Sequence, residues 1–126
     1  MTATHVGYAF SWIVSVTIIF IGMRFLLVPR AAAAAFGVAV PPDIGQADAY
    51  FAVKGIRDIA SGLIPIALIL ASTQHALGWF MLMVTVVPIG DALIVLRHQG
   101  PKVTAYAIHG LTAVLLLITA GLLLLG

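Results

Sequence analysis

Ionisable side chains lie inside long apolar stretches of this sequence, where a charge is costly. An ionised side chain at the centre of a bilayer costs at least about 2.5–3.5 kcal/mol. Such residues are retained where they pair with one another, line a cavity or serve a function. The candidates for a functional site are Arg24, Lys54, Arg57, Asp58, Asp91, Tyr106 and His109.

The chemistry open to this set is ligand binding with proton exchange. Arg57 and Lys54 can pair with a negative group of a ligand, while Asp91 or His109 can exchange a proton with it. Lys54 and Asp58 are four residues apart, so on a helix they share one face.

Arg57 and Asp91 are expected to be electrostatic partners on neighbouring helices. Arginine stays protonated in proteins, so inside a membrane it needs an anion. Asp58 is adjacent to Arg57 in the sequence, but on a helix it points about 100° away. Asp91 is the other carboxylate deep within the apolar stretches, about a turn closer to the cytoplasm, and the long arginine side chain can cover that offset.

Two further residues extend the set. Tyr106, His109 and Thr112 are spaced by three residues, which predicts a polar stripe on one helix. Arg24 lies near the end of its stretch, where it can join the site or extend its side chain to the lipid headgroups. The ionisable groups lie roughly 6–15 Å from helix ends on one side of the membrane, which predicts a single polar cluster.

No metal or nucleotide site is predicted. The chain has no cysteine, which removes disulfides, thiolate catalysis and Cys-ligated metals. Asp58, Asp91 and His109 are too few for a transition-metal site, and a haem with two axial histidines needs a second histidine at a matching depth. Glycine-rich phosphate-binding motifs are absent. The sequence leaves open which cofactor, if any, is used.

The composition is that of an integral membrane protein. Hydrophobic residues make up 63% of the 126 residues and charged residues 8%, whereas a soluble domain carries roughly 25% charged residues. This excludes a soluble enzyme and a disordered chain. The net charge of +2 comes from few residues, so it indicates no nucleic-acid partner.

Four apolar stretches are long enough to cross a membrane: residues 7–28, 47–71, 77–97 and 103–125. A helix needs about 20 apolar residues to do so, and none of the stretches alternates as the strands of a membrane barrel do. Two of the connections are short, which makes consecutive helices antiparallel neighbours. We therefore predict an all-α fold, a single transmembrane domain (residues 1–126) built as an antiparallel four-helix bundle.

The connection after the first stretch is the longest. Residues 31–42 begin with an apolar run that is too short to span a bilayer, and Pro41-Pro42 ends any helix there. We predict a short helix that lies at the membrane interface or tucks under the bundle. Pro65 and Pro88 each remove one backbone hydrogen bond within a span and can kink it.

Basic residues near the connections predict the orientation. Arg24, Arg30, Arg97 and Lys102 flank the first and third connections, and the opposite side carries no lysine or arginine. The positive-inside rule then places these connections in the cytoplasm and both termini outside it. We expect the protein to lie in the cell (inner) membrane.

Small residues form stripes on the first two predicted helices. Ser11, Ser15 and Gly22 share a face of the first helix, and Gly55 and Gly62 share a face of the second. Small residues let membrane helices approach closely, so we expect these faces to be packed.

The run Tyr50–Leu63 contains a Lys-Gly-x-Arg-Asp-x-x-x-Gly core. It resembles the signature of a family of small uncharacterised integral membrane proteins, a domain of unknown function within the wider group of four-helix, DoxX-like membrane proteins. Pro29–Gly37, Gly90–Ala92 and His109 also look like this pattern, so the resemblance covers nearly the whole chain. It implies a four-helix bundle with polar residues at these positions and implies no activity, although some DoxX-like proteins are associated with redox enzymes and quinones.

Three functions stay open at this point. The first is a binding protein or small membrane enzyme that holds a lipophilic or small anionic ligand at the polar cluster. The second is an accessory or assembly subunit of a membrane complex. The third is an oligomeric transporter, in which a second copy completes the path. The partners expected are therefore the lipid bilayer, such a ligand, and a second copy or a larger membrane complex.

Overall fold

The described part of the chain, residues 1–40 and 47–126 of the computed structural model, is helical and contains no β-strand. The helices are α1 (Ala3–Leu27), α2 (Pro29–Phe36), α3 (Ala47–Ala71), α4 (Gln74–Val84), α5 (Val86–Arg97), the π-helical η1 (Thr104–Gly110) and α6 (Leu111–Leu125). The prediction of an all-α fold is confirmed. Pro41-Pro42, on which the predicted helix break falls, lies outside the described residues.

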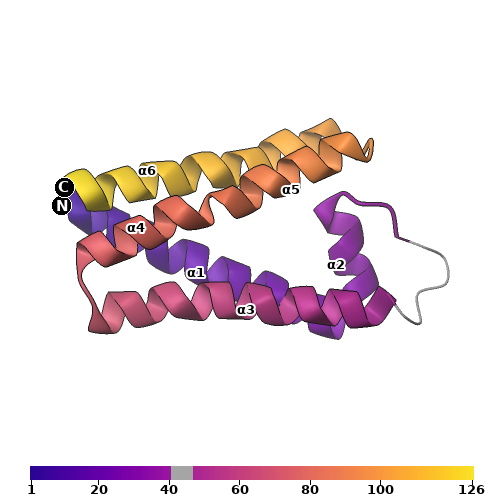
Figure 1. Ribbon diagram of the computed structural model, residues 1–126, viewed down its shortest axis with the longest axis horizontal. Coiled ribbons are helices and arrows are strands. Elements are labelled where there is room, and N and C mark those ends of the chain that lie inside the picture. Colours follow the sequence, from indigo (N-terminus) through magenta and orange to yellow (C-terminus); the bar gives the residue numbers. More distant parts are fainter. Residues whose placement is uncertain (41–46) are drawn as a thin grey trace.

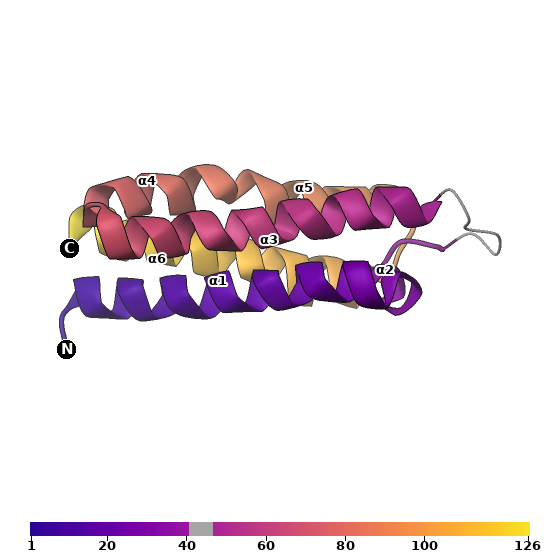
Figure 2. The same cartoon turned by 90° about the horizontal axis from the view of Figure 1, so that it is seen from below.

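The long helices run lengthwise in two packed pairs. Helix α3 lies beside α1, and α4 lies beside α6, which also contacts α1. Figures 1 and 2 show this pairing from two directions, with α2 lying across the bundle at one end. The two termini lie together at the other end (Figure 1).

Local signals explain where α1 and α2 begin and end. The Thr2 hydroxyl accepts a hydrogen bond from the His5 backbone N–H (3.3 Å), and the His5 ring bonds back to Thr2, which forms a capping box. Pro29 occupies the first turn of α2, where a missing N–H costs nothing. Gly37, with a φ of 100°, ends α2 in the left-handed conformation. Helix α2 tucks into the bundle, since its Ala32 is buried.

Two of the predicted spans contain an irregular turn. The stretch 77–97 forms α4 and α5, which are separated at Thr85. Pro88 cannot bond to the Val84 carbonyl because it has no N–H, and the Thr85 hydroxyl donates to the Met81 carbonyl (2.8 Å). The stretch 103–125 contains the π-helical η1 before α6. Pro65, by contrast, lies within the continuous helix α3.

Three stretches of the described chain are long and apolar enough to cross a membrane: Ala3–Leu27, Gln74–Arg97 and Thr104–Leu125. They indicate a membrane protein in contact with the lipid bilayer. The predicted span 47–71 is not among them, although α3 and α1 both have 25 residues. The difference is charge, because the N-terminal half of α3 contains Asp48, Lys54, Arg57 and Asp58.

The small-residue stripes form the contact between α1 and α3. A Cβ atom added to Gly22 would lie 2.6 Å from the Gly55 carbonyl oxygen, and one added to Gly62 would lie 2.6 Å from the Ser15 carbonyl oxygen. The Ser11 and Ser15 hydroxyls are fully buried and donate to carbonyls of α1 at 2.8 and 2.7 Å. The predicted close packing of these faces is confirmed.

Two apolar clusters fill the ends of the bundle. Leu77, Met81 and Leu123 are fully buried where α4 meets α6. At the other end, Phe25 of α1 packs with Ala32 of α2. The space between these clusters is a cavity, which Met81 and Phe25 bound from either end.

Candidate functional site

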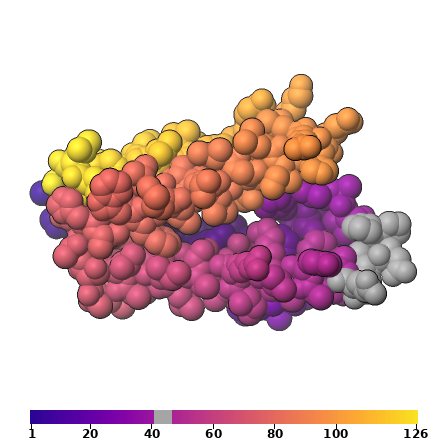
Figure 3. All heavy atoms as spheres, in the orientation of Figure 1, coloured from indigo at the N-terminus to yellow at the C-terminus, as the bar shows by residue number. Residues whose placement is uncertain are grey.

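A cavity of about 340 Å³ lies between the helices, and every helix contributes to its wall. Its charged lining residues are Arg24, Lys54, Asp58 and Asp91. Figure 3 shows a hollow between the magenta α3 and the orange α5, with the indigo α1 visible behind it. Helices α3 and α5 share little contact with each other on this side.

The cavity has a charged end and an apolar end. The charged end lies beside α2 and receives Lys54 from α3, Asp91 from α5 and His109 from η1. The opposite end is walled by aliphatic and thioether side chains such as Met81 and Leu116. A cavity of this kind matches a molecule with one polar and one apolar part.

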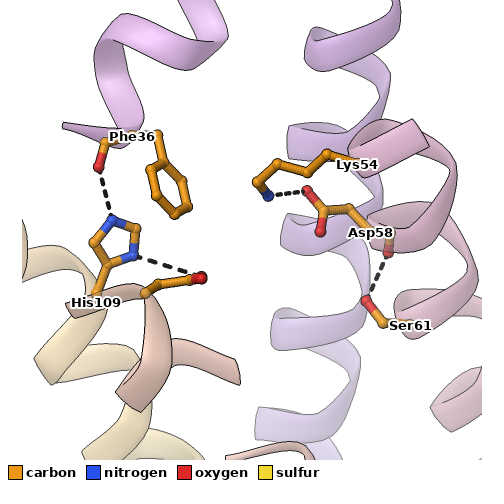
Figure 4. Close-up of polar contacts among 6 residues, drawn as sticks. Phe36, Lys54, Asp58, Ser61 and His109 are labelled. Atoms are coloured by element: carbon orange, nitrogen blue, oxygen red, sulfur yellow. Dashed lines mark hydrogen bonds and ion pairs between the residues drawn. The ribbon is translucent and has the colours of Figure 1, made fainter. Parts of the chain in front are cut away.

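Lys54 and Asp58 form an ion pair in the cavity wall. The Lys54 Nζ lies 2.7 Å from an Asp58 carboxylate oxygen, with the two side chains 32% and 11% exposed. The ammonium also lies 4.5 Å from the centroid of the Phe25 ring and 5.0 Å from that of Phe36, where the ring quadrupoles attract it. The Ser61 hydroxyl donates to the Asp58 backbone carbonyl (2.8 Å; Figure 4). The predicted sharing of a face by Lys54 and Asp58 is confirmed.

His109 joins η1 to α2. Its Nε2 lies 2.8 Å from the Phe36 carbonyl oxygen, and since a carbonyl oxygen only accepts, Nε2 must carry the hydrogen. The Phe36 and His109 rings are also in contact, with centroids 4.5 Å apart. Figure 4 shows His109 and Lys54 on opposite sides of the Phe36 ring.

The other nitrogen of His109 faces Asp91. The Nδ1 atom lies 4.0 Å from an Asp91 carboxylate oxygen, which is within ion-pair range but too long for a direct hydrogen bond. Both side chains line the cavity, and an imidazole and a carboxyl group are among the groups that can exchange protons with a ligand.

The π-helical segment η1 sets the direction of His109. A π-helix closes its turn between residues five apart and often occurs at functional sites. Its wider turn places the ring of His109 against α2 and leaves Tyr106, three residues earlier, 64% exposed and away from the cavity. The predicted stripe of Tyr106, His109 and Thr112 is therefore wrong for Tyr106, because that spacing assumes an α-helix.

The predicted pair between Arg57 and Asp91 is also wrong. Arg57 is exposed and is not part of the cavity wall, and Asp91 has His109 as its neighbour. The face of α3 that carries Lys54 and Asp58 turns inward, which leaves Arg57 on the outer face beside the exposed Ile56. The structure thus brings most of the predicted cluster together and excludes Arg57 and Tyr106.

Phe36 is the main site residue that the sequence did not suggest. Its carbonyl binds His109 and its ring packs on both His109 and Lys54. The available signal was Gly37, because a glycine that ends a helix leaves unpaired carbonyl groups just before it. Among residues 1–40 and 47–126, no group of three or more His, Asp or Glu side chains converges as a metal site would require.

The family described as "Domain of unknown function (DUF4267)" matches residues 15–123. The chain belongs to this family. The DUF4267 match includes every charged residue of the cavity, and it confirms the predicted membership of an uncharacterised family. No curated protein and no solved structure matches the chain. The wider DoxX-like relationship stays a prediction.

Proposed function

We propose that this protein is a four-span membrane protein that binds a lipophilic molecule inside its bundle. The polar part of the molecule lies against Lys54, Asp58, Asp91 and His109, and its apolar part extends between α1, α4 and α6. The observation that carries the proposal is an interhelical cavity with charged groups gathered at one end.

The position of α3 in the chain supports a fourth crossing. Helix α1 ends near α2, whereas α4 begins at the end of the bundle that holds the termini, so α3 runs the full length between them (Figure 1). Its 25 residues measure roughly 38 Å at 1.5 Å per residue, enough for a hydrocarbon core of about 30 Å. Lys54 and Asp58 offset each other's charge, and the long stem of Arg57 can carry its guanidinium to the headgroups.

The composition of the wall supports a lipophilic occupant. Most lining residues are apolar, and a few charged groups stand among them as the pairs Lys54–Asp58 and Asp91–His109, which is the usual design of a small-molecule site. Asp91 and His109 lie side by side in the wall, where either group would be placed to exchange a proton with the polar group of the ligand.

The proposal is tested by filling the cavity from α2. Ala35 and Ala34 are both exposed alanines of this helix, but only Ala35 lines the cavity. We expect native mass spectrometry of the protein from mild detergent to show a bound lipophilic molecule, which Ala35→Phe loses and Ala34→Phe retains. Extraction into organic solvent would identify it.

Equal occupancy in both variants would place the ligand outside the cavity and contradict the proposal. So would a wild-type protein that carries no ligand and takes up neither hexadecanoic acid nor hexadecanol when these are added.

A further inference from the structure

Among the described residues, one cation of the cavity wall, Arg24, has no hydrogen-bond or ion-pair partner. Lys54 is bound to Asp58, and Asp91 lies beside His109. Arg24, on the last turn of α1, lines the same cavity. Within residues 1–40 and 47–126, its guanidinium makes no hydrogen bond or ion pair.

A guanidinium that has no partner among the described residues of the cavity wall can bind an anionic group of a ligand. Arginine does not lose its proton in proteins, and a charge held in apolar surroundings is costly until it meets an opposite charge. The planar guanidinium presents two parallel N–H groups (the fork), which can donate two hydrogen bonds to one carboxylate. Arg24 is partly buried and lines the cavity that the ligand would occupy.

We propose that the ligand is a single-chain amphiphile with a carboxylate head, such as a long-chain fatty acid, and that Arg24 binds the carboxylate. This inference rests on the proposed lipophile site and names its ligand class. The acyl chain would lie in the apolar end, beyond Asp58 and Ser61 along α3.

The charged residues of the cavity wall favour a ligand headgroup with a single negative charge. A phosphate monoester carries about 1.5–2 negative charges at pH 7 and would need a second free cation, but Lys54 is already held by Asp58. The carboxylates of Asp58 and Asp91 in the same wall would repel the additional charge.

The size of the cavity limits the ligand to one chain. Small-molecule cavities measure roughly 300–1,000 Å³, and this one, at about 340 Å³, lies at the lower end. It is too small for a phospholipid with two acyl chains. The hollow between α3 and α5 (Figure 3) faces sideways from the bundle, which suits a ligand that arrives from the bilayer.

The test compares two probes that share a chain and differ in charge. Hexadecanoic acid and hexadecanol are titrated into the detergent-solubilised protein at a pH at which the acid is ionised, and binding is followed by native mass spectrometry. We expect the acid to bind wild-type protein about tenfold more tightly than the alcohol, or better, because charged hydrogen bonds are among the strong ones. Equal affinities would overturn the proposal without the use of any variant.

Variants then assign the preference to Arg24. Arg24→Gln should bind the acid no better than the alcohol, with affinity for the alcohol unchanged. Arg57→Gln removes the same charge from the outer face of α3 and should keep the preference. If Arg24→Gln does not fold, Arg24→Lys should still lower acid affinity severalfold, since lysine lacks the fork. Equal losses in Arg24→Gln and Arg57→Gln, or an unchanged acid affinity in Arg24→Lys, would overturn the assignment.

Failure of this inference differs from failure of the proposed function. If acid and alcohol bind equally and Ala35→Phe blocks both, the cavity is a lipophile site and only the carboxylate specificity is wrong. If Ala35→Phe and Ala34→Phe bind both probes as wild-type protein does, the lipophile site itself is wrong.

Discussion

Replacement of Gly22 by alanine tests the contact that holds α1 to α3. The added Cβ would lie 2.6 Å from the Gly55 carbonyl oxygen and 2.9 Å from the Ile59 backbone nitrogen. The first distance is roughly 0.9 Å below an optimal separation of about 3.5 Å. Both neighbours are backbone atoms, so the methyl group can be accommodated only if the two helices move apart.

Two opposing effects determine how far Gly22→Ala changes the free energy of unfolding. Overpacking of this kind typically costs about 1–3 kcal/mol, while alanine stabilises a helix by about 1 kcal/mol relative to glycine. Gly90 and Gly121 are matched controls, because a Cβ at either position meets no atom of the described residues within 4 Å beyond its own helix. The free energy of unfolding of Gly22→Ala should therefore lie about 1–3 kcal/mol below that of Gly90→Ala or Gly121→Ala.

The assay is thermal unfolding in detergent micelles, followed by the fluorescence of Trp12 and Trp79 on α1 and α4. We expect Gly22→Ala to lower the apparent Tm and the two control variants to leave it unchanged or raise it. An apparent Tm of Gly22→Ala equal to that of Gly90→Ala would refute the close approach of α1 and α3.

Three further predictions concern topology and the cavity wall. A single cysteine at His75 should react with an impermeant maleimide added from outside the cell and one at Gln99 should not; the reverse pattern would invert the predicted orientation. Asp58→Asn should lower stability because it leaves the Lys54 ammonium unpaired, by less than the roughly 3–5 kcal/mol of a fully buried pair, since the Lys54 side chain is 32% exposed. Thermal unfolding compares this variant with the double variant Lys54→Met/Asp58→Leu, which should recover part of the lost stability. A double variant that recovers none of the loss would contradict the ion pair. His109→Leu should speed amide hydrogen exchange in α2 because the bond to the helix is lost, and unchanged exchange in α2 would show that apolar packing alone holds it.

Much of the fold is determined by short-range features of the sequence. Apolar runs of membrane length predicted the helices, because a backbone in lipid must satisfy its own hydrogen bonds. The pairing of Lys54 with Asp58 follows from a spacing of four residues on any α-helix, whatever surrounds it. The stripes on α1 and α3 predicted close packing because only small side chains allow it.

Other features depend on how the helices are rotated and separated. A depth argument placed Arg57 within about a helical turn of Asp91. Depth does not determine which face of α3 turns inward, and the structure leaves Arg57 exposed. Tyr106 and His109 were placed on one stripe by α-helical spacing, and the π-helical turn of η1 separated them. The residue pattern of this sequence did not predict the π-helix.

The cavity itself belongs wholly to the tertiary structure. Its wall combines residues from every helix of the described chain, so no one segment encodes the cavity. The sequence determined which ionisable residues lie within long apolar stretches, and an isolated charge is costly in apolar surroundings. Only the tertiary structure decided that His109, and not Arg57, lies beside Asp91, because partner choice between helices depends on distances of a few ångströms that helix packing alone fixes.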